Sequence, residues 1–321
     1  MFVEASVPGR VNLFGNPLDI YGGLVMSSSV ALRATVRARP AEALTFALGG
    51  RAFAVRGPDD LALRNDAFDF LRALVRSVPK MADCRIEVTT EIPVRSGLAG
   101  SAALMVAASA CLLKLAGRPS SLNDILRTAH KAEVEALGNF CGWNDFYACS
   151  LGGVNSFNYR TEVDCTPDIS PLVLPDGDVS FAIALTGNMH VSGSVNSNLW
   201  ARWQSGDAVV RAAYGKLAEL GRPARDAFAR KDWPAFGRLM LENFMCQHRL
   251  GAANEIEHRL VHKAMDLGAL GAKLCGAGHC GSIVVLARDD DHDKIHRGLE
   301  SVGGQRYFKV EPTEGLATTH S

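Results

Sequence analysis

The chain has 321 residues, of which 47% are hydrophobic and 21% charged, and its 34 basic residues balance 34 acidic ones. This length allows two domains, and the neutral balance excludes a strong overall field that would draw the protein to nucleic acid or to an anionic membrane. The longest apolar run, residues 102–113, is far shorter than the ~20 residues of a membrane span. We therefore expect a cytoplasmic protein with reduced cysteines, because its eight cysteines contain no CxxC pair.

The first half of the chain predicts a mixture of strands and helices. Alternating or short apolar segments predict strands, at residues 22–40, 44–55 (two short strands around Gly49 and Gly50), 84–93 and 151–159. Apolar residues at helical spacing predict helices, at residues 66–77, 101–116 and 121–138. No regular strand–helix–strand rhythm connects these elements.

The second half follows a polar, proline-containing stretch, residues 160–178, which is the best candidate for a domain boundary. The segments after it predict one strand, four helices, a strand–glycine turn–strand unit and a closing strand, at residues 179–187, 207–220, 223–230, 233–249, 254–268, 272–287 and 303–312. We expect an α+β fold with two domains, residues 1–168 and 169–321.

The segment "PVRSGLAGSAALMVAA", residues 93–108, joins a loose turn to a strong helix. Gly97 and Gly100 let a ligand approach the backbone, and the start of the helix near Ser101 offers unpaired N–H groups and partial positive charge. Phosphate is the natural guest of such a turn. The alternative is structural: the glycines only make a turn, and Ser101 only caps the helix. The segment lacks the GK[ST] ending of a Walker A loop.

A second glycine cluster, "GAGHCG" at residues 276–281, matches the GxGxxG pattern of dinucleotide-binding proteins. That pattern needs a helix after it, whereas the apolar "SIVVLA" that follows predicts a strand. A glycine turn between two strands fits better and argues against a nicotinamide dehydrogenase. His279 lies beside Cys275 and Cys280, but this spacing fits no common zinc site.

Residues 7–23, "VPGRVNLFGNPLDIYGG", are rich in groups that a sugar can use. Asp19 accepts hydrogen bonds from hydroxyl groups, Asn16 donates and accepts them, and Tyr21 offers a ring and a hydroxyl group. Arg10 is a fixed cation of the type that stabilises a moving phosphoryl group. The alternative is an ordinary loop in which Arg10 pairs with Asp19 at the surface.

Two further carboxylates stand near polar or helical segments. Asp145 lies in a polar notch within "CGWNDFYACSLGG", where it is either a turn or cap residue or a base that takes a proton from an attacking hydroxyl group. Glu133 lies late in a predicted helix, twelve residues upstream. It is either a metal ligand or a solvated helix residue, and spacing does not decide between these.

Together, these segments resemble the three motifs of the GHMP kinase superfamily, the small-molecule kinases that include galactokinase, homoserine kinase, mevalonate kinase and phosphomevalonate kinase. The first motif is similar to residues 7–23, the second to residues 93–108 and the third to "KLCGAGHCGSIVVL". The resemblance covers nearly the whole chain. It implies an N-terminal ATP-binding domain, a ferredoxin-like α+β C-terminal domain and an active site in the cleft between them.

The resemblance also implies roles for individual residues. The second motif would wrap the phosphates of ATP, with Ser96, Gly97, Leu98, Ala99, Gly100, Ser101 and Ala102. Ser101 would face Mg²⁺ and Glu133 would be the metal carboxylate. "CGWND" resembles the galactokinase-type "CGIMD", so Asp145 would be the catalytic carboxylate, with Arg10 lowering the barrier at the transferring phosphoryl. Asp19 falls on the sugar-binding aspartate, and Gly276 and Gly278 on the third-motif glycines.

Departures from the pattern bear on the substrate. Asn16 and Pro17 stand where galactokinases carry Glu-His, which puts galactose in doubt. "GNPLDIYGG" looks most like the first motif of glucuronokinase, and residues 192–207 also resemble that subgroup. An arginine suits a uronate carboxylate, and Arg202 is the first candidate and Arg95 the second, although both also fit surface positions. His279 and Cys280 replace part of a glycine run and would narrow the nucleotide or substrate mouth.

We interpret the chain as an ATP- and Mg²⁺-dependent sugar kinase that phosphorylates the anomeric hydroxyl group of a monosaccharide. A uronic acid, glucuronate, is the first choice. Asn16, Asp19, Tyr21 and Arg202 would contact it, together with Arg10 and Asp145. Galactose, arabinose, fucose and a heptose phosphate are the alternatives within the kinase class, and a non-catalytic sugar- or nucleotide-binding homologue is the alternative outside it. We expect a monomer or homodimer that binds neither nucleic acid nor membranes.

Overall fold

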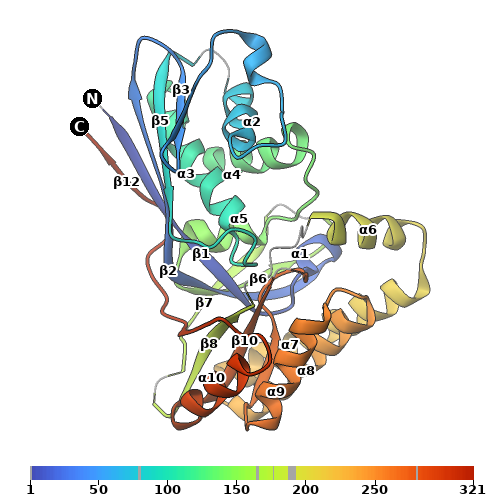
Figure 1. Ribbon diagram of the computed structural model, residues 1–321. Helices are drawn as coiled ribbons and strands as arrows, with labels where there is room; N and C mark the ends of the chain where they lie inside the picture. Colours follow the sequence, from blue (N-terminus) through green and yellow to red (C-terminus); the bar gives the residue numbers. More distant parts are fainter. Residues whose placement is uncertain (1, 79–80, 164–165, 176, 187–192, 280) are drawn as a thin grey trace.

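Figure 1 shows the computed structural model, which describes residues 2–78, 81–163, 166–175, 177–186, 193–279 and 281–321. Its larger sheet has eight strands, which run in the order β12-β1-β2-β5-β3-β4, with β6 paired to β2 and β7 to β6. The strands are β1 (Val3–Phe14), β2 (Gly23–Pro40), β3 (Thr45–Leu48), β4 (Arg51–Ala54), β5 (Cys84–Thr90), β6 (Val154–Tyr159), β7 (Asp168–Leu172) and β12 (Ala317–His320).

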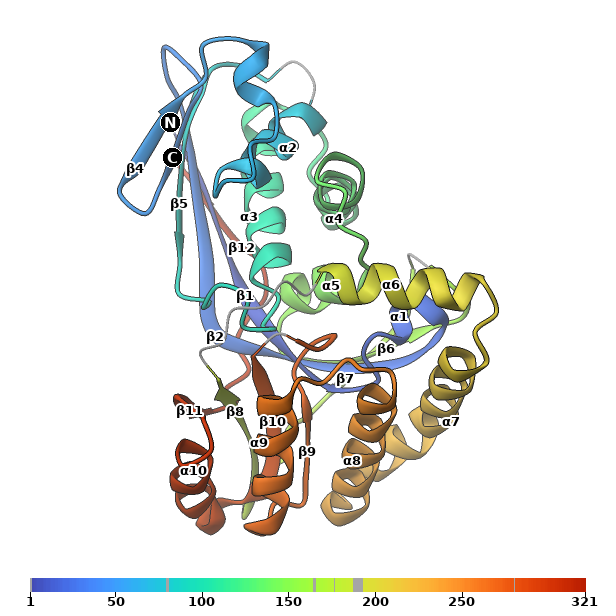
Figure 2. The same ribbon diagram turned by 45° about the vertical axis from the view of Figure 1, so that its right-hand side comes forward.

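Helices cover one face of this sheet (Figure 2). They are α2 (Asp69–Ser77), α3 (Gly100–Leu115), α4 (Leu122–Lys131) and α5 (Asn144–Leu151), with a 3₁₀ turn at Pro58–Leu61 and a π-helical turn at Ala132–Ala136. α3 is buried on almost every side because it packs on β1 and β2 and is flanked by α2, α4 and α5. Its nearly uniform apolar sequence is the pattern expected of such a helix.

The second sheet has four strands in the order β11-β8-β10-β9, and α7 to α10 lie in the lower half of Figure 2 with it, whereas α6 lies at mid-height beside α5. The strands are β8 (Val179–Leu185), β9 (Gly271–Leu274), β10 (Ser282–Arg288) and β11 (Arg306–Lys309). The helices of this half are α6 (Gly193–Gln204), α7 (Ala208–Ala229), α8 (Trp233–Arg249), α9 (Glu255–Asp266) and α10 (His292–Glu300), with a 3₁₀ turn at Asp289–Asp291. Within the described residues, no helix combines the length and apolarity needed to cross a bilayer.

The two halves meet along β1. The backbone N–H of Asn12 donates to Cys275 O (3.1 Å), which follows β9, and the N–H of Arg10 donates to Leu98 O (3.0 Å), which precedes α3. β1 therefore carries the first motif between the second and the third. α1 (Leu18–Tyr21) continues directly from this junction.

Most of the predicted strands and helices are confirmed, including the short hairpin around Gly49 and Gly50 and the glycine turn between β9 and β10. The alternation in β2 is confirmed as well, since Ala34, Val36 and Ala38 are fully buried. The prediction of two helices at 207–220 and 223–230 is wrong, because α7 runs unbroken through Pro223. The residues on both sides of the proline, Leu220, Gly221 and Ala224, are buried, so packing outweighs the lost hydrogen bond.

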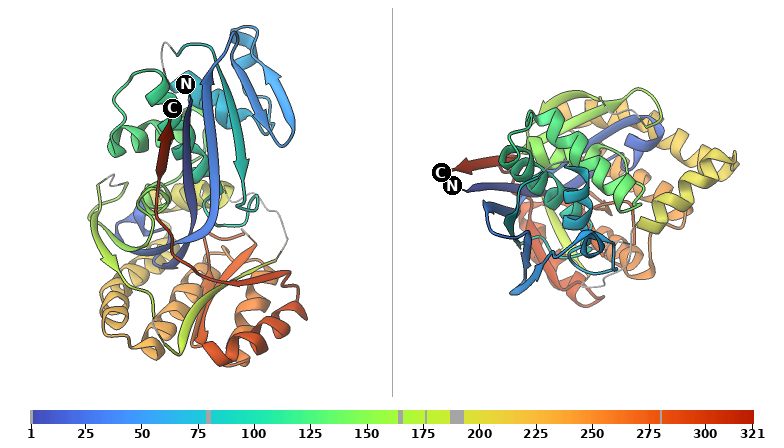
Figure 3. Two further views of the ribbon diagram at one scale, coloured as in Figure 1. Left: turned by 90° about the vertical axis from the view of Figure 1, so that its left-hand side faces the viewer. Right: turned by 90° about the horizontal axis from the view of Figure 1, so that it is seen from above.

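The polypeptide passes from the larger sheet to the second sheet and back again, whereas a single domain boundary would need only one such passage. β7 lies inside residues 160–178, the candidate domain boundary, and it pairs with β6 of the larger sheet. β12, near the C-terminus, also joins the larger sheet, where it pairs with β1. Figure 3 shows the two termini side by side at this edge. The division into residues 1–168 and 169–321 stays a prediction.

Candidate active site

A cavity of about 540 Å³ opens where the three motifs meet. Its lining includes most of the residues singled out in the sequence: Arg10, Asn16, Asp19, Arg95, Ser96, Gly97, Ala99, Gly100, Ser101, Ala102, Glu133, Asp145 and Gly276. Leu98 lies beneath it, fully buried, and holds Arg10 through its carbonyl oxygen. The structure thus places the three motifs around one space of the size of a small-molecule site.

The second motif turns sharply into α3. Gly97 (φ 73°) and Ala99 (φ 59°) both adopt left-handed backbone, as does Arg95 (φ 57°). The N-cap of α3 is Ala99, with no side-chain capping bond, so the expectation that Ser101 caps the helix is wrong. The turn at Ala99 starts the helix at Gly100, which places Ser101 inside its first turn. The first N–H groups of α3 therefore have no side-chain acceptor and suit an anion in the cavity.

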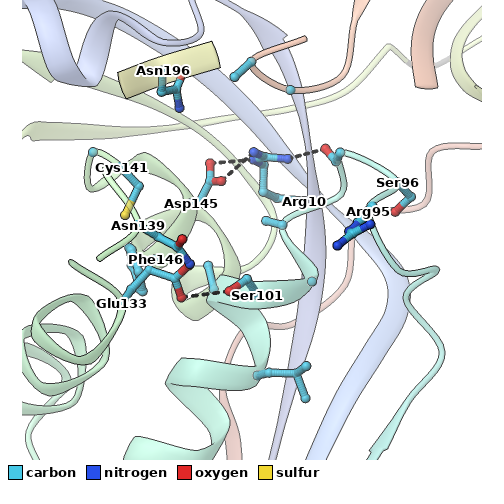
Figure 4. Close-up of a pocket in the computed structure, with 18 of the residues that line it drawn as sticks. Arg10, Arg95, Ser96, Ser101, Glu133, Asn139, Cys141, Asp145, Phe146 and Asn196 are labelled. Atoms are coloured by element: carbon cyan, nitrogen blue, oxygen red, sulfur yellow. Dashed lines mark hydrogen bonds and ion pairs between the residues drawn. The ribbon is translucent and has the colours of Figure 1, made fainter. Parts of the chain in front are cut away.

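Ser101 instead points across the cavity wall to Glu133 (Figure 4). Its Oγ donates to Glu133 Oε2 at 2.8 Å, and Asn139 Nδ2 donates to Glu133 Oε1 at 2.9 Å. Glu133 lies in the π-helical turn and is 7% exposed. Burial raises the pKa of this carboxyl group, and the bonds from Ser101 and Asn139 act against that rise. The alternative of a solvated helix residue is excluded by this burial.

Ser101 and Glu133 supply the hard oxygen atoms that Mg²⁺ prefers. Within the described chain, no three histidine, cysteine, aspartate or glutamate side chains converge on a common point. An ion held here would thus need further oxygens, such as those of phosphate and water, to complete six ligands. The donor set fits Mg²⁺ on a nucleotide better than a closed protein site for a metal.

Arg10 and Asp145 form a bidentate ion pair at the centre of the cavity (Figure 4). Arg10 Nε donates to Asp145 Oδ1 at 2.8 Å, and Arg10 Nη2 to Asp145 Oδ2 at 2.6 Å. Arg10 Nη1 donates to Gly97 O at 2.6 Å, so the same guanidinium joins the first and second motifs. Asp145 lies in the first turn of α5, so the short polar segment around it is the start of a helix. Arg10 is 3% exposed, so the fork is held in one geometry.

Asp19 is a second carboxylate in the same cavity. It is 4% exposed, and its Oδ2 accepts from the backbone N–H of Asn144 at 3.0 Å. Its Oδ1 is buried and has no hydrogen-bond partner among the described residues. Burial and the nearby charge of Asp145 raise the pKa of Asp19 to about 7. A Cβ at Gly142 would lie 2.1 Å from Asp19 Oδ2, so glycine is needed for this approach.

Tyr21, Arg202 and His279 also lie outside the cavity lining. Tyr21 is buried against Tyr214, with ring centroids 3.9 Å apart. Arg202 Nε donates to Asp207 Oδ2 at 2.8 Å, in a pair next to the start of α7. His279 Nε2 contacts Gly251 O at 2.8 Å rather than the cavity. Cys280 falls outside the described residues.

The third motif contributes through its backbone. Gly276 and Ala277 line the cavity, whereas Gly278 does not. A Cβ at Gly278 would lie 2.0 Å from Ala252 O, and its φ is 113°, so this glycine lets the motif pack on the start of the α8–α9 connection.

Sequence reasoning missed several lining residues. Asn196 faces the cavity from α6, and Phe70 and Leu104 line it from α2 and α3. Phe70 and Leu104 lie on predicted helices, but nothing in their spacing marks them as lining rather than core. Asn196 lies in residues 192–207, whose resemblance to glucuronokinases drew attention to Arg202 and not to this residue, and α6 was not predicted.

Two family models match the sequence: the GHMP kinases N-terminal domain over residues 63–153 and the GHMP kinases C-terminal domain over residues 224–305. A mevalonate kinase of Pyrococcus horikoshii is 25% identical, with 98% of this chain and 97% of that protein covered. A galactokinase of Thermococcus kodakarensis is 26% identical, with 96% and 98% covered. The solved galactokinase of Lactococcus lactis, complexed with galactose, shares the fold with a TM-score of 0.85, 18% identity and 98% and 95% coverage.

Proposed function

Because this chain belongs to the GHMP kinase family and is a kinase of small molecules, we propose that it phosphorylates a monosaccharide at the anomeric hydroxyl group, with Mg·ATP as donor. The observation that carries the proposal is the buried Asp19 Oδ1, which lies in the cavity with the Arg10–Asp145 pair and finds no partner within the part of the chain that the structure describes. A hydroxyl group of a sugar is the donor such an oxygen lacks. An apolar or anionic group at this place would leave it unpaired.

In the proposed mechanism, each cavity group has one task. Asp145 orients the attacking hydroxyl group and takes its proton, and Arg10 holds that carboxylate and faces the charge of the transferring phosphoryl. The open N-terminus of α3 binds phosphate oxygens. Ser101 and Glu133 would hold Mg²⁺, which supplies positive charge against the phosphates. Catalysis by this set is positioning and electrostatic stabilisation.

The identity of the sugar is the finer part of the proposal. Glucuronate stays the first candidate because of the resemblance in the first motif. Its carboxylate needs a cation, and Arg95 is the candidate arginine that lines the cavity, whereas Arg202 pairs with Asp207 outside the lining. A neutral sugar such as galactose is the second candidate, favoured by the two carboxylates Asp19 and Asp145, which repel an anionic group beside them.

The test is release of ADP from Mg·ATP against a panel of glucuronate, galacturonate, glucose, galactose, mannose, fucose, arabinose and a heptose phosphate, with mevalonate and homoserine as outgroups. Turnover of a monosaccharide, with phosphate on the anomeric oxygen by NMR, is the expected result. Turnover confined to mevalonate or homoserine would contradict the proposal. Nucleotide binding without any turnover would favour the non-catalytic alternative.

The panel is repeated with Asp145→Asn, which keeps the size of the side chain and removes the base. We expect turnover to fall by about 10²- to 10⁴-fold while nucleotide binding stays near normal. Asp207→Asn removes a carboxylate from the Arg202 pair outside the cavity and is the matched control. Near-normal turnover in Asp145→Asn would remove Asp145 from the mechanism. The proposed cytoplasmic location and the monomeric or dimeric state need separate measurements.

A further inference from the structure

Lys273 places a positive charge in the interior between the two halves of the molecule. It lies in β9, close before the third-motif glycines, and is fully buried. Its Nζ donates to three oxygens: Asn12 O at 3.1 Å, Asn12 Oδ1 at 3.2 Å and Leu274 O at 2.5 Å. A buried charge is costly, and an apolar side chain of similar length is often equally stable in its place. Lys273 therefore calls for a role other than stability.

A chain of buried polar side chains starts at this ammonium group. Asn12 Nδ2 donates to Ser27 Oγ at 3.4 Å, and Ser27 Oγ donates to Asn144 Oδ1 at 3.4 Å. Asn144 Nδ2 then donates to Asp145 Oδ1 at 3.3 Å. Asn12, Ser27 and Asn144 are each at most 1% exposed. This hydrogen-bond chain connects Lys273 in β9 to the carboxylate of Asp145, which the proposed mechanism uses as base.

The two ends of this hydrogen-bond chain favour one direction for the bonds next to them. An ammonium group only donates, so it holds Asn12 by the amide oxygen and leaves the amide nitrogen for Ser27. The N–H of Asn16 also donates to Asn12 Oδ1, at 3.3 Å, and supports the same orientation. Asn144 Nδ2 lies 3.3 Å from Ser27 Oγ and 3.3 Å from Asp145 Oδ1, so its two hydrogens can serve both oxygens, and the carboxylate, which only accepts, takes one of them.

Asn144 also reaches the second carboxylate of the cavity. Its backbone N–H donates to Asp19 Oδ2 at 3.0 Å, while its side chain donates to Asp145. The orientation of this one residue thus bears on both carboxylates.

We propose that Lys273 is a positioning residue for Asp145, acting through Asn12, Ser27 and Asn144. The inference rests on the proposed function, because it gives Asp145 the task of base. Without the ammonium group, Asn12 Oδ1 keeps the long bond from the Asn16 N–H (3.3 Å), which holds the Asn12 amide less firmly. A looser Asn12 weakens its bond to Ser27 Oγ and, through Ser27, the hold on Asn144. Lys273 touches neither substrate nor nucleotide in this proposal.

The test compares Lys273→Met, which keeps the length and removes the donors, with Ser27→Ala, which breaks the chain at its middle. We expect each to lower kcat by about 10- to 100-fold and to leave KM for Mg·ATP unchanged, because a small displacement of the base affects the chemical step alone. The double variant should be no slower than either single one, since both break the same chain. Ser109→Ala, which removes a buried hydroxyl group from the middle of α3, is the matched control and should keep kcat.

Several results would overturn the inference. A normal kcat in Ser27→Ala would overturn it even if Lys273→Met failed to fold. A double variant whose loss in kcat equals the product of the two single losses would overturn it as well. A rise in KM for Mg·ATP together with an equal loss in Ser109→Ala would show a general effect on the core instead.

Crystal structures of the wild type and of Ser27→Ala test the inference without any substrate. In Ser27→Ala, we expect the Asn144 amide to turn away from Asp145 and the Asp145 carboxylate to move. A carboxylate in the wild-type position would contradict the inference. If the wild type phosphorylates no sugar, the proposed function is contradicted. The position of the Asp145 carboxylate in the two crystal structures then still tests whether the hydrogen-bond chain positions it.

Discussion

At Asp19, the demands of folding and of substrate binding oppose each other. The carboxyl group is buried, has a neighbouring carboxylate and keeps one oxygen without a partner. A charged form in this place is costly before a substrate arrives. The same uncovered oxygen is the group that a sugar hydroxyl can satisfy.

This conflict predicts a dependence of stability on pH. The pKa of Asp19 is about 7 in the folded protein against 3.8 for the free side chain, so between these values the folded state binds more protons than the unfolded state. The contribution of Asp19 to stability is therefore full below pH ~4 and is lost as the pH rises to ~7. We expect Asp19→Asn to have a melting temperature near that of the wild type at pH 4.5 and above it at pH 8. Thermal denaturation at both pH values measures this.

The exposed Asp83→Asn is the control for the loss of a carboxylate as such. A difference between Asp19→Asn and the wild type that does not change with pH would contradict a raised pKa at this residue.

Arg95 raises a second question at the scale of one residue. Its backbone is left-handed (φ 57°), which costs a non-glycine residue roughly 1 kcal/mol or more. Its side chain is exposed at the cavity, beside the turn that leads into α3. Arginine at a backbone position that favours glycine suggests that the charge of the guanidinium group has a function in the cavity.

We expect Arg95→Gly to raise the free energy of unfolding by about 1 kcal/mol and to raise KM for Mg·ATP several-fold. Lys231→Gly is the matched control, because Lys231 is an exposed cation with the same φ of 57° at the end of α7. It should gain similar stability with unchanged KM. Chemical denaturation and steady-state kinetics check both variants. An unchanged KM in Arg95→Gly would show that the charge does not serve the nucleotide, and a rise in KM for a uronate alone would assign it to the sugar.

Among the elements, α8 and β9 approach each other closely. A Cβ on Gly237 of α8 would lie 2.1 Å from Leu270 O, and a Cβ on Gly271 of β9 would lie 2.4 Å from Gly237 O. The helix and the strand therefore touch backbone to backbone. This contact supports the strand that carries Lys273.

Gly237→Ala should therefore lower the free energy of unfolding by about 3 kcal/mol, because backbone cannot move aside as a side chain does. Gly215→Ala in α7 is the matched control, since nothing lies within 4 Å of its Cβ position. That variant should gain up to about 1 kcal/mol, as alanine favours a helix over glycine. Urea denaturation of the two variants measures the difference. Equal stabilities would mean that α8 shifts to make room.

Elements with a strong periodic pattern were predictable from the sequence, and elements defined by their surroundings were not. α3 and β2 carry long apolar patterns, and both were found. α5 has only two turns and begins at a polar pair, Asn144 and Asp145, that also fits a loop. β7 is exposed along most of its length and contains Pro171, so no alternation marks it as a strand.

The same division holds in the candidate site. The turn before α3 could be predicted because its pattern is local: small residues followed at once by a helix. The pairing of Arg10 with Asp145 joins residues 135 positions apart, and the contact of Asp19 with Asn144 joins residues 125 apart. The sequence suggested a surface pair of Arg10 with Asp19 as the alternative, because it shows candidates for pairing but not which of them the fold brings together.

On the scale of the whole molecule, the larger sheet depends on both ends of the chain. Val3–Ser6 of β1 pairs with β2 on one side and with β12 on the other. Phe2 and Ser321 also exchange backbone hydrogen bonds, each of 3.2 Å. Without β12, β1 would present its unpaired backbone groups to solvent.

We expect deletion of residues 316–321 to lower the melting temperature by several degrees and to promote self-association through the exposed edge of β1. Removal of Ser321 alone, which loses only the contact with Phe2, is the control. Thermal denaturation and size-exclusion chromatography check the result. A truncated protein as stable and as monodisperse as the control would show that β12 is dispensable.

The pairing of β1 with β12 also bears on how fast the molecule can fold. Ser6 pairs with Ala317, so this contact closes a loop that contains almost the entire chain. The entropy of closing a loop grows with its length, and proteins whose contacts are far apart in sequence have high contact order and fold slowly. The edge that protects the sheet in the native state is thus the part whose formation has the largest entropic cost.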